Sequence, residues 1–173
     1  MAKKAKARKK VAARNAKKVQ PIPAGYHAIT PYLGIKGAGQ AIEFYKRAFG
    51  AKELVRIPGP DGTVGHAELK IGDSLVMLAD ESRSMGFLGP HSRGGTTIQL
   101  HFYVRDVDAT VQSAMAAGGK LTRPIEDKFY GDRAGTIEDP YGHVWYIATH
   151  KEDVPAKEMK RRMDEVMKKP AGG

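Results

Sequence analysis

The sequence predicts an α+β fold made of two tandem βαβββ modules that are related by a pseudo-twofold axis. Both halves of the chain contain strand and helix patterns in the same order, and glycine-containing turns separate the expected strands. Corresponding residues recur about 69 positions apart, as Ile35 and Val104 do. Because one module alone would leave apolar surface uncovered, we expect the two modules to bury each other and to form a ligand pocket between or beside them.

The first module is expected between residues 26 and 81. The run HAITPYLGIKG, which starts at His27, has the alternation of a strand. In the following run, apolar residues recur at helical spacing and Gly50 stands where a C-terminal cap belongs, which predicts a helix over residues 38–49. Three further strands are expected in the runs KELVRIP, VGHAELKI and SLVMLAD.

The second module is expected between residues 97 and 153, after a linker over residues 82–96. The linker contains Gly, Ser and Pro without a period. A strand in IQLHFYV and a helix in DVDATVQSAMAAGG follow it, and then strands in GKLTRPI, DRAGTIEDP and GHVWYIATH. The remaining residues, 154–173, are expected to form an amphipathic helix and a tail.

The positive charge of the chain is concentrated at its N-terminus. The net charge is +10, and residues 1–20 hold nine of the 29 Lys and Arg residues, which leaves 20 basic against 19 acidic residues elsewhere. Residues 1–25 are therefore expected to be a disordered basic tail, because this composition buries too little apolar surface to fold. Non-specific binding of nucleic acid through residues 1–20 is one functional hypothesis.

The composition also bears on location and on cysteine chemistry. The chain has no cysteine, which excludes disulfides, thiolate catalysis and Cys-ligated zinc, and fits a reducing compartment. No stretch is apolar for long enough to be a secretory signal or a membrane helix. The sequence therefore predicts a soluble cytoplasmic protein without a membrane partner.

Three runs carry a resemblance to a known family: TPYLGIKGAGQAIEFYKRAFGA, GHAELKIGDSLVMLAD and GTIEDPYGHVWYIATHKEDV. Over about residues 27–154 the chain resembles the glyoxalase/bleomycin-resistance/dioxygenase (vicinal oxygen chelate) superfamily, and within it the PhnB-like proteins. The resemblance implies the two-module fold of that superfamily, a cleft that takes a small molecule, and a homodimer.

The resemblance also implies four metal-ligand positions, which hold His, Gln or Glu in metal-dependent members. These positions fall here on Thr30, Met77, Gln99 and Tyr146. Neither Met nor neutral Tyr suits the hard metals of the family, and Gln99 is the one conventional ligand of the four. We therefore expect neither a metal site nor another cofactor, although a rearranged divalent-metal site that includes His101 stays open.

Strand alternation places polar side chains on the concave side of the sheets. His66 and Glu68 share a face, so the carboxylate would fix the tautomer of the imidazole, and His101 would serve as a general base. These three residues are the catalytic candidates, and half-exposed strand positions without a catalytic role are the alternative for each. Arg133 is a candidate for gripping a carboxylate or phosphate, with a surface ion pair as its alternative. The ligand-binding candidates are Thr30, Tyr32, Met77, Gln99, Tyr103, Arg133, Glu138 and Tyr146.

Three functions remain open at this point. The first is a small molecule bound in the cleft between the modules, without the usual metal site. The second is a glyoxalase-type lyase or isomerase that uses His66, Glu68 or His101, with or without a metal. The third is the association of the basic tail with nucleic acid. The sequence leaves open whether the protein is an enzyme, because this fold hosts binding proteins, isomerases and oxygenases.

Overall fold

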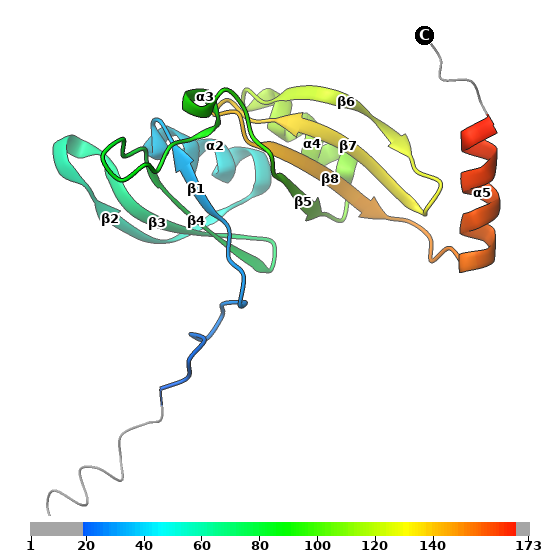
Figure 1. Ribbon diagram of the computed structural model, residues 1–173, viewed down its shortest axis with the longest axis horizontal. Coiled ribbons are helices and arrows are strands. Elements are labelled where there is room, and N and C mark those ends of the chain that lie inside the picture. Colours follow the sequence, from blue (N-terminus) through cyan, green and yellow to red (C-terminus); the bar gives the residue numbers. More distant parts are fainter. Residues whose placement is uncertain (1–18, 169–173) are drawn as a thin grey trace, which may run out of the picture.

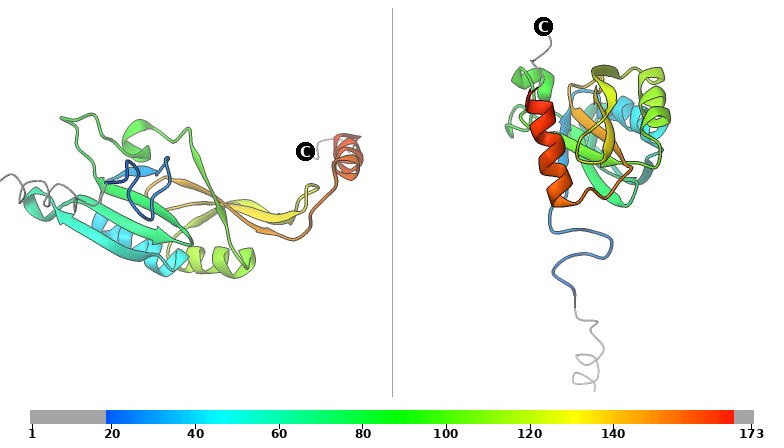
Figure 2. Two further views of the ribbon diagram at one scale, coloured as in Figure 1. Left: turned by 90° about the horizontal axis from the view of Figure 1, so that it is seen from below. Right: turned by 90° about the vertical axis from the view of Figure 1, so that its right-hand side faces the viewer.

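The computed structural model describes residues 19–168 and contains two four-stranded sheets along its long axis (Figure 1). The helices α2 and α4 lie on the same side of the two sheets and pack against each other (Figure 2). Residues 1–18 and 169–173 lie outside the described residues, so the prediction for most of the basic tail concerns a part of the chain that the structure does not describe. The predicted α+β class with two βαβββ modules is confirmed.

The first module has the sheet order β1-β4-β3-β2, in which β1 runs parallel to β4 and the other pairs are antiparallel. Its helix has the predicted bounds, and its apolar stripe is buried. The first strand begins at Tyr32 rather than at His27, because Pro31 has no N–H to donate to the ladder and Ile29 is 88% exposed. The elements are β1 (Tyr32–Ile35), α2 (Ala38–Phe49), β2 (Lys52–Pro58), η1 (Pro60–Gly62), β3 (Val64–Ile71) and β4 (Ser74–Asp80).

The second module repeats this arrangement with the sheet order β5-β8-β7-β6. Again the first strand runs parallel to the fourth, and the other pairs are antiparallel. A short helix, α3 (Pro90–Arg93), lies in the segment that joins the modules and was not predicted. The other elements are β5 (Gln99–Tyr103), α4 (Val107–Ala116), β6 (Lys120–Asp127), β7 (Asp132–Glu138), β8 (Val144–His150) and α5 (Ala156–Lys168).

The strand registers of the two modules correspond at the spacing read from the sequence. Tyr32 lies opposite Met77 in the first module, and His101 lies opposite Tyr146 in the second. Each first helix is also tied to its sheet at an equivalent point. The amide of Ala38 donates to Asp80, and the amide of Val107 donates to the hydroxyl of Thr149. The two modules are therefore repeats of one structural unit.

Aromatic residues fill the junction between the modules. Phe49 of α2 has its ring centroid 4.7 Å from that of Trp145 and 5.5 Å from that of Phe102, both in the second module. Tyr45 also contacts Trp145, with a centroid distance of 5.5 Å. Burial of such large side chains is a major favourable term in folding, so this cluster holds the modules together.

A buried carboxylate lies at the same junction. Asp139, in the turn between β7 and β8, is 2% exposed. Its Oδ2 accepts hydrogen bonds from the hydroxyl of Tyr45 at 2.7 Å and from Nε1 of Trp145 at 3.0 Å. Its Oδ1 accepts from the amides of Tyr141 and His143, each at 2.9 Å. Burial and the charge of Asp139 raise the pKa of Tyr45, so its phenol stays protonated and donates to the carboxylate.

The segment between the modules packs closely against β1. A Cβ added to Gly34 would lie 3.1 Å from the carbonyl carbon of Leu88, and one added to Gly89 would lie 2.4 Å from the carbonyl oxygen of Gly34. The carboxylate of Glu81 accepts from the amide of Gly89 at 2.7 Å and from the hydroxyl of Ser92 at 2.8 Å. The segment is thus fixed to the first module by these contacts.

The last helix, α5, stands apart from the two sheets (Figure 1) and has no buried residue. Arg162 pairs with Glu152, and Met163 and Val166 are exposed. None of the helices within residues 19–168 combines the length and the apolar character that crossing a bilayer requires.

We predict that Asp139→Ala lowers the free energy of unfolding by about 3 kcal/mol, because four buried donors lose their acceptor. Urea unfolding followed by circular dichroism measures this change. Asp73→Ala is the matched control, since Asp73 lies in an exposed turn and, among residues 19–168, accepts a side-chain hydrogen bond only from Ser74. The control is expected to change stability by less than about 0.5 kcal/mol. Equal effects of the two substitutions would contradict the structural role given to Asp139.

Candidate functional site

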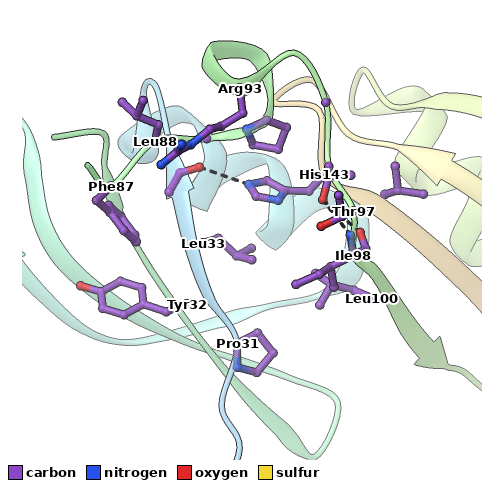
Figure 3. Close-up of a pocket in the computed structure, with 16 residues that line it drawn as sticks. Pro31, Tyr32, Leu33, Phe87, Leu88, Arg93, Thr97, Ile98, Leu100 and His143 are labelled. Atoms are coloured by element: carbon purple, nitrogen blue, oxygen red, sulfur yellow. Dashed lines mark hydrogen bonds between the residues drawn. The ribbon is translucent and has the colours of Figure 1, made fainter. Parts of the chain in front are cut away.

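A cavity of about 470 Å³ lies where the two modules meet (Figure 3). It is open on one side, and its walls come from β1, from the segment that joins the modules, and from the starts of β5 and β8. Its volume falls in the range of small-molecule sites. The lining residues are Pro31, Tyr32, Leu33, Gly34, Phe87, Leu88, Gly89, Pro90, Arg93, Gly95, Thr96, Thr97, Ile98, Leu100, His143 and Val144.

Most of this lining is apolar. The rings of Tyr32 and Phe87 meet edge to face with centroids 5.1 Å apart and form one wall. Ile98 and Leu100 lie on the opposite side of the cavity (Figure 3). Ile98 is 67% exposed in this structure, which is unusual for a large aliphatic side chain at a concave surface.

Besides the hydroxyl groups of Tyr32, Thr96 and Thr97, the lining has two nitrogen-containing polar side chains, His143 and Arg93. Nε2 of His143 lies 3.3 Å from the carbonyl oxygen of Gly34, which can only accept, so Nε2 is the protonated nitrogen. Burial lowers the pKa of His143, which keeps the ring neutral. Arg93 donates from Nη2 to the carbonyl oxygen of Gly86 at 2.7 Å. The cavity therefore contains one neutral imidazole and one guanidinium.

A second cavity, of about 460 Å³, lies next to the first along the same junction. Pro31 and Leu100 line both cavities, so the two share a wall. Three of the candidates from the sequence, Thr30, His101 and Tyr103, line this second cavity. Its other lining residues come from the β3–β4 turn, from residues 27–31 and from β5 and β8.

A hydrogen-bonded chain connects the first cavity to the concave face of the first sheet. The hydroxyl of Tyr32 lies 2.9 Å from Nδ1 of His66, and Nε2 of His66 lies 3.2 Å from Oε1 of Glu68. Tyr26 donates its hydroxyl to the other oxygen of Glu68. This hydrogen bond is the main cause of the lowered pKa of Glu68 and of the raised pKa of Tyr26. Because ionised Glu68 only accepts, the network assigns the proton of neutral His66 to Nε2 and leaves Nδ1 to accept from Tyr32.

A separate polar group lies on the second sheet. His101 has ring centroids 4.5 Å from Tyr103 and 4.9 Å from Tyr146. The hydroxyl of Tyr146 lies 2.5 Å from that of Tyr130, and burial is the main cause that raises the pKa of Tyr130 to about 12. Tyr103 donates to the buried carboxylate of Asp132 at 2.9 Å. Within the described part of the chain, His101 is not hydrogen-bonded to the His66 chain, so the three catalytic candidates do not form one group.

The other candidates lie in different places. Met77 is in register with both Tyr32 and Glu68 and so lies between them on the first sheet. Gln99 and Glu138 flank Val144, which lines the first cavity. Arg133 instead forms a two-pronged ion pair with Asp108 at 2.8 Å and a second pair with Asp127 at 3.4 Å. Arg133 therefore lies in a surface ion pair, which was the alternative to a role in ligand binding, and it lines neither cavity.

The side chains at the four expected metal positions do not fit a divalent metal. Thr30 donates its hydroxyl to the carbonyl oxygen of His27, Met77 offers a thioether, and the hydroxyl of Tyr146 is bonded to Tyr130. Within residues 19–168, no cluster of three or more His, Cys, Asp and Glu side chains could hold a metal ion.

Sequence reasoning missed several residues of the site. Phe87, Leu88 and Arg93 lie in the segment that was interpreted as a linker, and a Gly- and Pro-rich segment without a period gives no signal of the wall it forms. Tyr26 directly follows the expected tail of residues 1–25, and no role was predicted for it. Phe87 was the available signal, since solvated linkers are poor in aromatic residues.

Comparison with known proteins identifies relatives of the chain. Residues 27–147 match the model of the Glyoxalase/Bleomycin resistance protein/Dioxygenase superfamily. Protein Rv0887c of Mycobacterium tuberculosis is 41% identical over 139 residues, which cover 79% of this chain and 82% of that protein. The crystal structure of TioX from Micromonospora sp. ML1 has 30% identity and a TM-score of 0.58, over 72% of this chain and 98% of TioX. The PhnB protein of Bacillus cereus has 20% identity and a TM-score of 0.57, over 71% of this chain and 99% of that one, and this likeness concerns the fold alone.

We predict that Tyr26→Phe raises the pKa of Glu68 toward its ordinary value, because the variant removes the hydrogen bond that most stabilises the carboxylate. Carbon-detected NMR titration of the side-chain carboxyl groups measures this pKa. Tyr103→Phe is the control, since Tyr103 donates to Asp132 on the other sheet. An unchanged pKa of Glu68 in Tyr26→Phe would show that the N-terminal segment does not lie against the first sheet.

Proposed function

The chain belongs to the Glyoxalase/Bleomycin resistance protein/Dioxygenase superfamily, and from this membership we propose that it binds a small molecule in the cavity between its two modules. The binding would take place without the usual metal site of the family. The observation that carries this proposal is the cavity of about 470 Å³, lined by residues of both modules and of the segment that joins them.

Three features of the cavity support a binding role. Its apolar lining provides the area that small ligands bury, and its few polar groups can fix their orientation. The segment 87–98 forms one side and is held by Glu81, so the cavity is largely formed before a ligand arrives. The second cavity across Pro31 and Leu100 would accommodate the rest of a longer ligand.

We predict that a panel of aromatic and aliphatic small molecules contains compounds that raise the thermal midpoint of the protein. Thr97→Trp should abolish this stabilisation, because Thr97 lines the cavity and an indole would fill part of it. Differential scanning fluorimetry measures both effects. Gln112→Trp adds the same bulk on the exposed face of α4 and should leave the stabilisation intact. The proposal fails if no compound stabilises the protein, or if Thr97→Trp responds like Gln112→Trp.

A glyoxalase-type lyase or isomerase is the second candidate function. The observation that favours it is the hydrogen-bonded network of Tyr32, His66 and Glu68. Tyr32 lines the cavity and would contact a substrate there. Glu68 orients His66, which is placed to take a proton through the Tyr32 hydroxyl. Within the described residues, His101 lies on the other sheet and does not belong to this hydrogen-bonded network.

For this candidate we predict that His66→Gln lowers the turnover of hemithioacetals of α-oxoaldehydes by about 100-fold, because the variant lacks the general base that removes the carbon-bound proton. A spectrophotometric assay of the purified protein measures turnover. His150→Gln is the control, because His150 lies at the far end of β8 and pairs with Asp132 and Asp153. Equal turnover in His66→Gln and in the unmodified protein would exclude His66 as the general base, and the absence of turnover in the unmodified protein would exclude the enzymatic function and leave the binding function standing.

A further inference from the structure

We infer that the ligand of the first cavity is a small apolar anion, such as an aromatic carboxylate, whose acidic group lies beside Arg93. This inference rests on the proposed binding function and adds the chemical class of the ligand. It depends on the charge of the lining, on the surroundings of Arg93 and on the shape of the apolar walls.

The lining of the cavity contains a positively charged side chain and no negatively charged one. Sixteen residues form it, and none of them is Asp or Glu. Burial keeps His143 neutral, so the guanidinium of Arg93 is the charged side chain of this set. A cationic ligand would meet this positive charge without a compensating carboxylate, whereas an anion would be attracted.

Arg93 lines the first cavity. Among the described residues it forms no ion pair, and neither do Arg47, Arg83, Arg105 and Arg123. Arg56, Arg133, Arg161 and Arg162 each form ion pairs with carboxylates. Within residues 19–168, Arg93 has no carboxylate partner within 4.0 Å and makes one hydrogen bond, from Nη2 to the carbonyl oxygen of Gly86. A guanidinium has five N–H donors in a planar fork, so donors remain for a ligand.

The carboxylate nearest to Arg93 in the sequence is already engaged. Oε1 of Glu81 accepts from the amide of Gly89, and Oε2 accepts from the hydroxyl of Ser92, the neighbour of Arg93. These hydrogen bonds fix the segment that carries Arg93 without neutralising Arg93 itself. The guanidinium is therefore positioned by Gly86 and by the fixed segment. Its positive charge is available to pair with a bound anion.

The walls favour a flat apolar body. Tyr32 and Phe87 form an edge-to-face pair on one side, and Ile98 and Leu100 lie on the other (Figure 3). Arg93 lies at the linker end of the cavity and Pro31 at the opposite end (Figure 3). A planar aromatic ring between these walls would place an attached carboxylate near Arg93. Because Arg93 is exposed, water screens part of this ion pair, and the apolar walls provide most of the area that the ligand would bury.

Three matched probes test the inference: naphthoate, its neutral amide naphthamide, and the cation naphthylmethylammonium. Isothermal titration calorimetry of the full chain gives the Kd of each. We expect naphthoate to bind about threefold more tightly than naphthamide, since the ion pair with an exposed guanidinium is partly screened by water, and the cation to bind most weakly. Arg93→Gln should remove the preference for naphthoate, and Arg93→Lys should retain most of it.

Arg83→Gln is the matched control, because it removes the same charge from the same segment at a position outside the lining. It should keep the preference for naphthoate. Equal affinity for naphthoate and naphthamide, or a preference that survives in Arg93→Gln, would overturn the anion inference while leaving the binding function in place. If none of the three probes binds, the anion inference is overturned, whereas the binding function is decided separately by the panel of small molecules and by Thr97→Trp. Circular dichroism of the variants verifies that each is folded.

Discussion

The buried carboxylate of Asp139 connects the parts of the molecule on which the candidate site depends. One of its oxygens binds Tyr45 of the first module and Trp145 of the second, and the other organises the turn that leads into β8. A buried charge is costly unless every lone pair is used, and here four donors use it. The relative position of the two modules, and hence the cavity between them, is set by this carboxylate and by the aromatic cluster around it.

The turn at Asp139 also places a residue of the cavity. The amide of His143 binds Asp139, while its side chain reaches the carbonyl oxygen of Gly34 in the other module. Gly34 in turn lies against Leu88 and Gly89 of the joining segment. A continuous set of contacts therefore runs from the module junction to the segment that carries Arg93. This arrangement explains how a segment with little regular structure can form a defined wall.

Much of the fold followed from local patterns in the sequence. The helix over residues 38–49 was predicted with its observed bounds, because its apolar stripe and Gly50 mark them. The spacing of about 69 residues held because equivalent strands keep the same register in both modules. The first strand was predicted too long, since alternation alone does not show that Pro31 interrupts the ladder.

The site was less accessible to sequence reasoning. Strand alternation correctly grouped His66 with Glu68, because residues two apart share a face, but the contact of Tyr32 with His66 became visible only in the structure. Alternation could not show that His101 belongs to a second, separate group, or that Arg133 is paired with Asp108. These facts depend on which strands become neighbours and on contacts between distant segments. Arg93 and Phe87 were missed for the same reason, since only the folded chain brings them to β1.

The space between the modules, rather than the open face of either sheet, is the proposed ligand site, and a crystal structure of the protein soaked with naphthoate would locate the probe. We expect electron density for the naphthyl ring between the wall of Tyr32 and Phe87 and the wall of Ile98 and Leu100, with the carboxylate at Arg93. Density for the probe against His66 and Glu68 on the first sheet, or against His101 and Tyr146 on the second, with an empty space between the modules, would contradict this proposal.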